Sequence, residues 1–292
     1  MNFAKRRRLV LFGLSAMVCF QPATSPAVIT RDDQPDSAYV ALGALADFVP
    51  VGLFSSGGGY TGCGILIAPD WVLTAAHLLI ASSGTFTING TSYDSTQVFR
   101  NSGWNGDVLH GNDFGLVHLA SSLTAIPPAM FYTGSVETNQ VGTFVGYGFT
   151  GTGLTGWKTI DGQKRAFKNV IDGNFGNPYL LLGADFDNPN NPGDNWFGSA
   201  TPLTLEGCVA PGDSGGGVFI QQGPQYYLAG VISGILATDG NANGDYGDIT
   251  AYGRLSAALP WINSIINVPE PSVGSLLIGT GLVALCFRLR KQ

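Results

Sequence analysis

Short apolar runs, separated by clusters of glycine, asparagine, aspartate and proline, make up most of residues 31–266 of this 292-residue chain. Such runs are typical of β-strands, and many of them in series predict a sandwich or a barrel. The clearest runs are 64–67, 71–73, 114–119, 144–145, 218–220 and 226–232. Only Leu255–Ile266 carries apolar residues at convincing helical spacing. The sequence therefore predicts an all-β domain that ends in a helix.

Composition limits the classes of partner. The chain has 42 glycines, 12% charged residues and a net charge of −6. Because no basic face is present to meet a phosphate backbone, we expect no nucleic-acid partner. The length is sufficient to bury the core of one large all-β domain or of two small ones.

The N-terminus reads as an export signal covering residues 1–27. Positive residues at 5–8 precede an apolar stretch at 9–20, and small residues precede a cleavage point after Ala27. The mature chain would begin near Val28. A twin-arginine signal and a lipidated cysteine are the weaker alternatives. Export also makes a disulfide between Cys63 and Cys208 permissible, but spacing alone leaves their pairing open.

Three segments carry residues suited to nucleophilic catalysis. His77 closes the segment TAAH, Asp113 comes directly before an apolar run, and Ser214 lies in the segment GDSGG. A serine hydroxyl needs a base to remove its proton, and the histidine needs a carboxylate to fix its tautomer. The order His, Asp, Ser along the chain matches one known convergent solution. Asp107 is the alternative acid, but the strand that begins after Asp113 favours the latter.

Glycines surround the candidate nucleophile. Gly212 permits a tight turn in which the amides of Gly212 and Ser214 could both point at a developing oxyanion. Gly215 and Gly216 would then let substrate approach closely. We interpret the other two histidines, His110 and His118, as structural.

These segments resemble those of the chymotrypsin/trypsin-type serine endopeptidases, over roughly residues 48–266. The resemblance implies two six-stranded antiparallel β-barrels, with the domain covering 28–266 and the boundary between barrels near 125–136. His77 and Asp113 would lie on the first barrel and Ser214 on the second. The chemistry would need no cofactor, and the substrate would be a protein or peptide.

The resemblance also assigns residues around the substrate. The pocket for the side chain before the scissile bond would have Cys208 at its base, with Ser233, Ile235 and Thr250 on its strands and walls. Because Cys208 stands where trypsin has an aspartate and branched residues stand on both walls, we expect cleavage after small apolar residues. Asp213 would pair with a new N-terminus at Val28 and so shape the oxyanion hole.

The C-terminal segment 267–292 has a separate character. Pro-Glu-Pro at 269–271 is followed by an apolar stretch at 273–287 and a basic end. This arrangement resembles the PEP-CTERM sorting signal, which implies processing by an exosortase-type enzyme and transient membrane contact through the apolar stretch. The expected location is the cell envelope, the outer surface or the medium.

Two alternatives complete the predictions. Asp239–Asp245 follows the first half of a calcium loop, but Thr250 stands where a bidentate carboxylate is needed, so a polar turn is favoured over a metal site. A catalytically inactive surface-binding domain on a protease fold is the competing function. An esterase of the α/β-hydrolase type is disfavoured because its histidine follows the serine along the chain, whereas His77 precedes Ser214.

Overall fold

The structure is a computed structural model that describes residues 28–266 except 58, 135, 175–179 and 197. The predicted signal peptide and the predicted sorting segment lie outside the described residues. The helical elements are α1 (Asp36–Gly43), η1 (Ala46–Phe48), η2 (Ala76–Leu78), η3 (Pro192–Asp194) and α2 (Leu255–Ile266). The strands are β1 (Val28–Thr30), β2 (Val51–Ser56), β3 (Tyr60–Ala68), β4 (Trp71–Thr74), β5 (Gly84–Ile88), β6 (Thr91–Arg100), β7 (Gly115–Leu119), β8 (Val141–Gly146), β9 (Thr150–Thr152), β10 (Gly156–Thr159), β11 (Arg165–Val170), β12 (Gly173–Asn174), β13 (Leu181–Asp185), β14 (Gly207–Cys208), β15 (Gly217–Gln222), β16 (Gln225–Leu236) and β17 (Ile249–Arg254).

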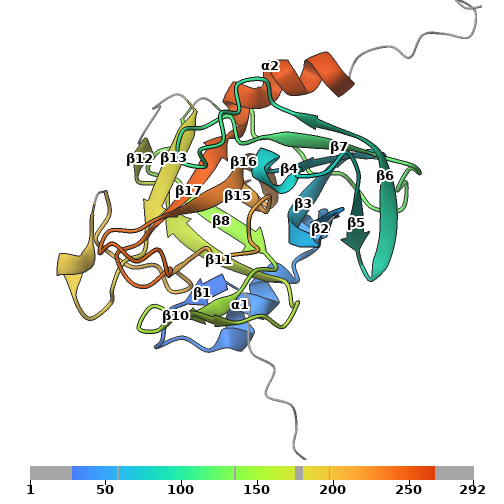
Figure 1. The fold of residues 1–292 in the computed structure, drawn as a ribbon. Helices are drawn as coiled ribbons and strands as arrows, with labels where there is room; N and C mark the ends of the chain where they lie inside the picture. Colours follow the sequence, from blue (N-terminus) through green and yellow to red (C-terminus); the bar gives the residue numbers. More distant parts are fainter. Residues whose placement is uncertain (1–27, 58, 135, 175–179, 197, 267–292) are drawn as a thin grey trace, which may run out of the picture.

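The first unit is a closed barrel with the strand order β2-β3-β4-β7-β6-β5 (Figure 1). Its strands turn alternate side chains inward, as expected for a sheet with one buried face. Phe54, Ile65, Phe86 and Leu116 are fully buried in its core. Closure leaves the barrel without free edges, and it sets the end of β4 beside the start of β7.

The second unit is a seven-stranded antiparallel sheet with the order β11-β8-β15-β16-β17-β13-β12. The all-β class and the late helix predicted from the sequence are confirmed. The closure differs from the expected six-stranded barrel, because this sheet remains open between β11 and β13. The side chain of Asn169 on β11 spans that gap and donates to the carbonyl of Asp185 at the end of β13, at 2.7 Å.

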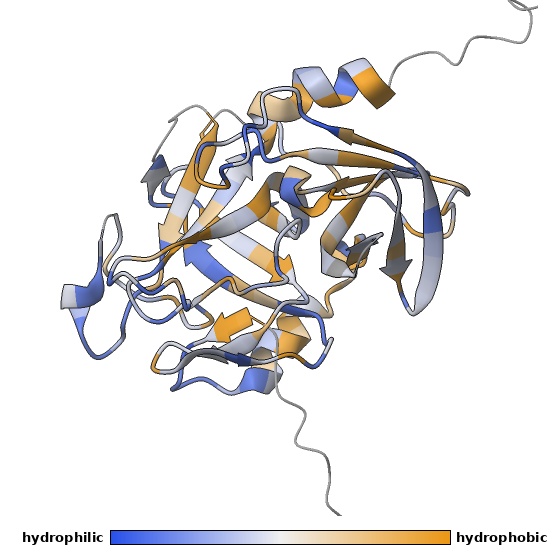
Figure 2. Cartoon of the chain, viewed as in Figure 1, coloured by the Kyte–Doolittle hydropathy of each residue, from blue (hydrophilic) through white to orange (hydrophobic). Residues whose placement is uncertain are grey.

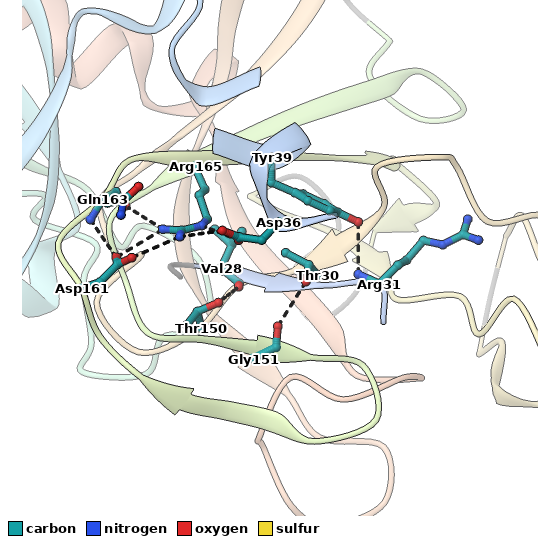
Figure 3. Close-up of polar contacts among 10 residues, drawn as sticks. All are labelled: Val28, Thr30, Arg31, Asp36, Tyr39, Thr150, Gly151, Asp161, Gln163 and Arg165. Atoms are coloured by element: carbon teal, nitrogen blue, oxygen red, sulfur yellow. Dashed lines mark hydrogen bonds and ion pairs between the residues drawn. The ribbon is translucent and has the colours of Figure 1, made fainter. Parts of the chain in front are cut away.

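The N-terminal segment is built into this second unit. β1 lies inside a four-stranded sheet of order β10-β9-β1-β14, where Ile29 pairs with Cys208. The Tyr39 hydroxyl on α1 donates to the carbonyl of Glu206 at 2.9 Å. The same hydroxyl accepts from the amide of Arg31 at 3.1 Å (Figure 3). Val28 and Ile29 are buried. The segment is therefore part of the folded core.

A buried arginine fastens α1 to β11. Arg165 is 1% exposed, and its guanidinium lies between the carboxylates of Asp36 and Asp161 (Figure 3). The Nε atom is 2.7 Å from Asp36 and an Nη atom is 3.1 Å from Asp161. Two carboxylates supply the charge and the acceptors that a buried guanidinium requires.

Helix α2 begins and ends where the apolar spacing predicts, and it lies across the opposite end of the molecule from β1 and α1 (Figure 1). Leu255, Ala258 and Ile262 form its buried face.

Hydrophobic residues run along β13, β16 and β17, whereas the loop that carries η3 is mainly hydrophilic (Figure 2). Among the described residues, none of the helices has the length and apolar character needed to span a membrane.

Candidate active site

His77 lies in η2, three residues after β4 ends. Strand β4 pairs with β7, so the loop after β4 and the loop before β7 meet at one end of the barrel. The Asp113 carboxylate, 1% exposed, accepts from the His77 backbone amide at 2.9 Å and contacts ring Nδ1 at 2.7 Å. Because the ionised carboxylate only accepts, this contact assigns the proton of the neutral ring to Nδ1 and leaves Nε2 as the base.

Ser233 is a member of this network that the sequence assigned elsewhere. Its hydroxyl lies 2.5 Å from Asp113 Oδ2 and 2.9 Å from the carbonyl of Val108. The single hydroxyl proton can serve one acceptor at a time, and the carboxylate is the stronger. Ser233 was expected at the substrate pocket, but its side chain is buried against the acid. Ser233 lies within β16, and no local pattern in the sequence marks this contact.

Ser214 lies in a turn that has a glycine two residues before it and another directly after it. Gly212 and Gly215 have φ of +93° and +79°, a region that side chains disfavour. A Cβ on Gly215 would collide with the Cys63 carbonyl and the Thr74 hydroxyl, and one on Gly216 would meet the Val145 carbonyl. Gly215 and Gly216 therefore allow close packing against other parts of the protein. The sequence had instead suggested that they let the substrate approach closely.

The amides of Gly212 and Ser214 donate no hydrogen bond to any other part of the chain that the structure describes. Both residues line a cavity of about 570 Å³. Its other walls are mainly apolar and come from both units: Leu53, Gly59, Thr61, Leu78, Tyr147, Phe149, Ile160, Gly162 and Pro211. No local motif predicts this cavity, because its walls are scattered over more than 150 residues.

Asp213 is fully buried beside the nucleophile. Its carboxylate accepts from the amides of Ala210 at 2.8 Å and Gly148 at 2.7 Å. Burial raises its pKa to about 7, against the opposing effect of these two hydrogen bonds. No ion pair joins it to another group within the described ranges.

The predicted pocket residues are only partly brought together. The Cys208 thiol and the Thr250 hydroxyl are 3.4 Å apart and fully buried, while Ile235 is half-buried on β16. None of the three lines the cavity beside Ser214. Cys63 and Cys208, whose pairing the sequence left open, are both free thiols.

Acidic side chains gather at two further places. Asp239, Asp245 and Asp248 hold carboxylate oxygens within 4.8 Å of one another, so a third acid joins the predicted turn.

Elsewhere in the second unit, burial raises the pKa of Glu206 to about 8, although its carboxylate accepts from the amides of Leu203 and Asp187. These groups lie outside the cavity that Ser214 lines.

Comparisons with known proteins agree with this architecture. The family profile named Trypsin matches residues 48–166, and the PEP-CTERM protein-sorting motif matches residues 267–291. Chymotrypsin-like elastase family member 3B of Homo sapiens is 29% identical over 244 residues, which cover 72% of this chain and 80% of the relative. Chymotrypsin-like elastase family member 1 of Rattus norvegicus is 28% identical over 274 residues, covering 81% and 93%.

The fold and these matches define a serine endopeptidase, a hydrolase. Residues 48–166 match the Trypsin family model, and the PEP-CTERM sorting motif that follows them indicates export to the cell envelope or surface in bacteria. The domain implies a peptide substrate, and the motif implies processing by an exosortase.

Proposed function

We propose that the protein is an exported endopeptidase that hydrolyses peptide bonds through an acyl-enzyme on Ser214. The observation that carries this proposal is the buried Asp113 carboxylate, which holds His77 by two contacts. A packing histidine would not need its tautomer fixed by an acid with 1% exposure. We also propose transient membrane contact through residues 273–287 before the tail is removed.

In acylation, the Ser214 oxygen attacks the carbonyl carbon of the substrate while His77 Nε2 takes the hydroxyl proton. The Asp113 carboxylate stabilises the imidazolium that results. The carbonyl oxygen gains negative charge, and the two open amides of Gly212 and Ser214 are the donors for it. The bond between carbon and nitrogen then breaks, and His77 returns the proton to the departing amine.

In deacylation, a water molecule replaces the amine. His77 removes one of its protons as the oxygen attacks the ester carbon, and the same two amides receive the oxyanion. The ester bond breaks, and the proton on His77 passes to the Ser214 oxygen. The carboxylic acid leaves and the enzyme returns to its starting state.

The proposed activating pair joins Asp213 to the α-amino group of Val28. Support comes from β1, which already lies within the second unit with Val28 and Ile29 buried. A cation beside Asp213 would offset the burial that raises the pKa of this carboxyl to about 7. Processing after Ala27 would then complete the turn that carries Ser214.

For specificity we propose a preference for small apolar side chains before the scissile bond. The Cys208 thiol is neutral because burial raises its pKa, and the Thr250 hydroxyl contacts it at 3.4 Å. Neither side chain offers the negative charge that an arginine or lysine would need. The two similar relatives are named elastases, and elastases have a small pocket for the side chain before the scissile bond.

A fluorophosphonate probe tests the function directly. We expect one probe per mature protein, attached to Ser214 in peptide mapping, because only an activated serine reacts readily. The matched control is Ser214→Ala, which should take up none. N-terminal sequencing of the labelled protein should begin at Val28. A folded mature protein that stays unlabelled would instead favour the inactive binding domain, and a start beyond Ile29 would remove the activating pair.

Peptide substrates that differ in one side chain test the specificity. We expect kcat/KM for alanine or valine before the scissile bond to exceed that for phenylalanine or arginine by about tenfold or more. The measurement uses one peptide framework, so that contacts elsewhere are constant. A clear preference for arginine or phenylalanine would contradict the proposed pocket while leaving the hydrolase intact.

A further inference from the structure

Cys63 on β3 of the first barrel touches the nucleophile turn at two points. Its backbone amide donates to the carbonyl of Ser214 at 2.7 Å, and its thiol donates to the carbonyl of Gly212 at 3.2 Å. The residue is fully buried. These contacts cross between the two units, since the turn belongs to the second one.

The thiol is held in its neutral form. Burial, together with the negative charge of Asp213, raises the pKa of Cys63 well above its usual range. A thiol that keeps its proton can donate a hydrogen bond, although more weakly than a hydroxyl. The same burial makes the sulfur a poor nucleophile, so the geometry suits a structural donor better than a reactive group.

The carbonyl of Cys63 completes a link to the base. It accepts from the Thr74 hydroxyl at 2.7 Å, and Thr74 ends the strand that leads into His77. Gly215 packs against this same pair of oxygens, which is why a side chain cannot be accommodated there. One residue therefore contacts the turn of the nucleophile and the strand of the base.

The thiol donates to the peptide group that joins Gly212 to Asp213, and without this hydrogen bond that group could rotate. Gly212 has a φ of +93°, and glycine meets little steric resistance to other backbone angles. Anchors of the turn also come from the second unit, among them the Phe149 amide, which donates to the Pro211 carbonyl at 2.7 Å, and the Asp213 amide, which donates to the Ala210 carbonyl at 3.0 Å. Among the residues that the structure describes, the thiol is the side-chain donor that reaches the turn from the first barrel.

We propose that Cys63 is a positioning residue for catalysis: its thiol fixes the peptide that follows Gly212 and so keeps the two open amides aimed at the oxyanion. This inference rests on the proposed function, because it assigns a role within the same site. Cys63 touches no reacting atom. Its effect should therefore appear in the stabilisation of the transition state and leave substrate binding nearly unchanged.

The experiment compares two variants that differ in the donor. Cys63→Ala removes the thiol, and we expect kcat to fall about 3- to 10-fold with KM changed less than about twofold, the size of one neutral hydrogen bond. A peptide aldehyde, which adds to the serine and places an oxygen at the amides, should lose affinity by the same factor. Cys63→Ser keeps a donor and should retain kcat within about threefold.

The controls separate positioning from packing and from failure of the whole proposal. Ile88→Val removes a methylene from the buried core of the first barrel, at a residue that does not line the cavity beside Ser214, and should leave kcat and aldehyde affinity unchanged. If Cys63→Ala does not fold, Cys63→Val supplies a second variant without a donor. A folded variant lacking the donor that keeps full kcat and aldehyde affinity would overturn the inference, as would a serine variant as impaired as the alanine one. An unlabelled wild-type protein would instead refute the proposed function before any variant is compared.

Discussion

Replacing Asp113 with asparagine is expected to lower kcat by about 10⁴-fold with little change in the fold. The asparagine has nearly the same shape, but its single carbonyl oxygen cannot accept both from the His77 backbone amide and from ring Nδ1, which the two carboxylate oxygens serve separately. The ring would then adopt the other tautomer and present a proton, where a base is needed, to Ser214. The loss should appear in kcat, measured on an alanine-type peptide substrate at pH 8.

Asp107→Asn is the matched control for this prediction. Asp107 was the competing acid in the sequence, and the structure shows it exposed and capping the amide of Leu109 at 2.9 Å. This variant should retain kcat within about twofold, because surface substitutions of this kind have small effects. Equal losses in the two variants, or none in Asp113→Asn, would show that the base is not held by Asp113.

Replacing Arg165 with methionine is expected to lower the free energy of unfolding by about 3–5 kcal/mol. The change leaves Asp36 and Asp161 without the guanidinium that lies between them (Figure 3). It also removes a positive charge that lowers the pKa of the buried Asp213 carboxyl. Urea unfolding followed by circular dichroism measures the difference.

Lys168→Met tests whether the effect comes from burial or from net charge. Lys168 lies on the same strand, β11, but is half-buried and makes no ion pair with any described residue. Its loss should cost no more than about 0.5 kcal/mol. If both variants lose similar stability, the acids around Arg165 are adequately solvated without it, and the buried cluster is not what anchors α1.

The parts of the site that the sequence could predict are those carried by local motifs. The segments around His77, Asp113 and Ser214 stand out because each combines a reactive residue with an unusual neighbourhood. Helix α2 was predictable residue by residue, because its apolar spacing covers three full turns. In each instance the information lies within about a dozen consecutive residues.

The remainder depends on pairings between distant segments, which no local pattern encodes. Ser233 meets Asp113 across 120 positions, and Cys63 meets Gly212 across 149. Arg165 reads in the sequence like any surface arginine, because its burial is set by an acid 129 positions away.

The interior position of β1 has a practical consequence for anyone who produces this protein. A fusion partner joined directly to Val28 would have to emerge from the middle of a four-stranded sheet, beside β9 and β14. Affinity handles are better appended after α2, which lies at the far end of the molecule from that sheet (Figure 1). The choice of terminus thus determines whether a recombinant preparation keeps its native amino-terminal strand.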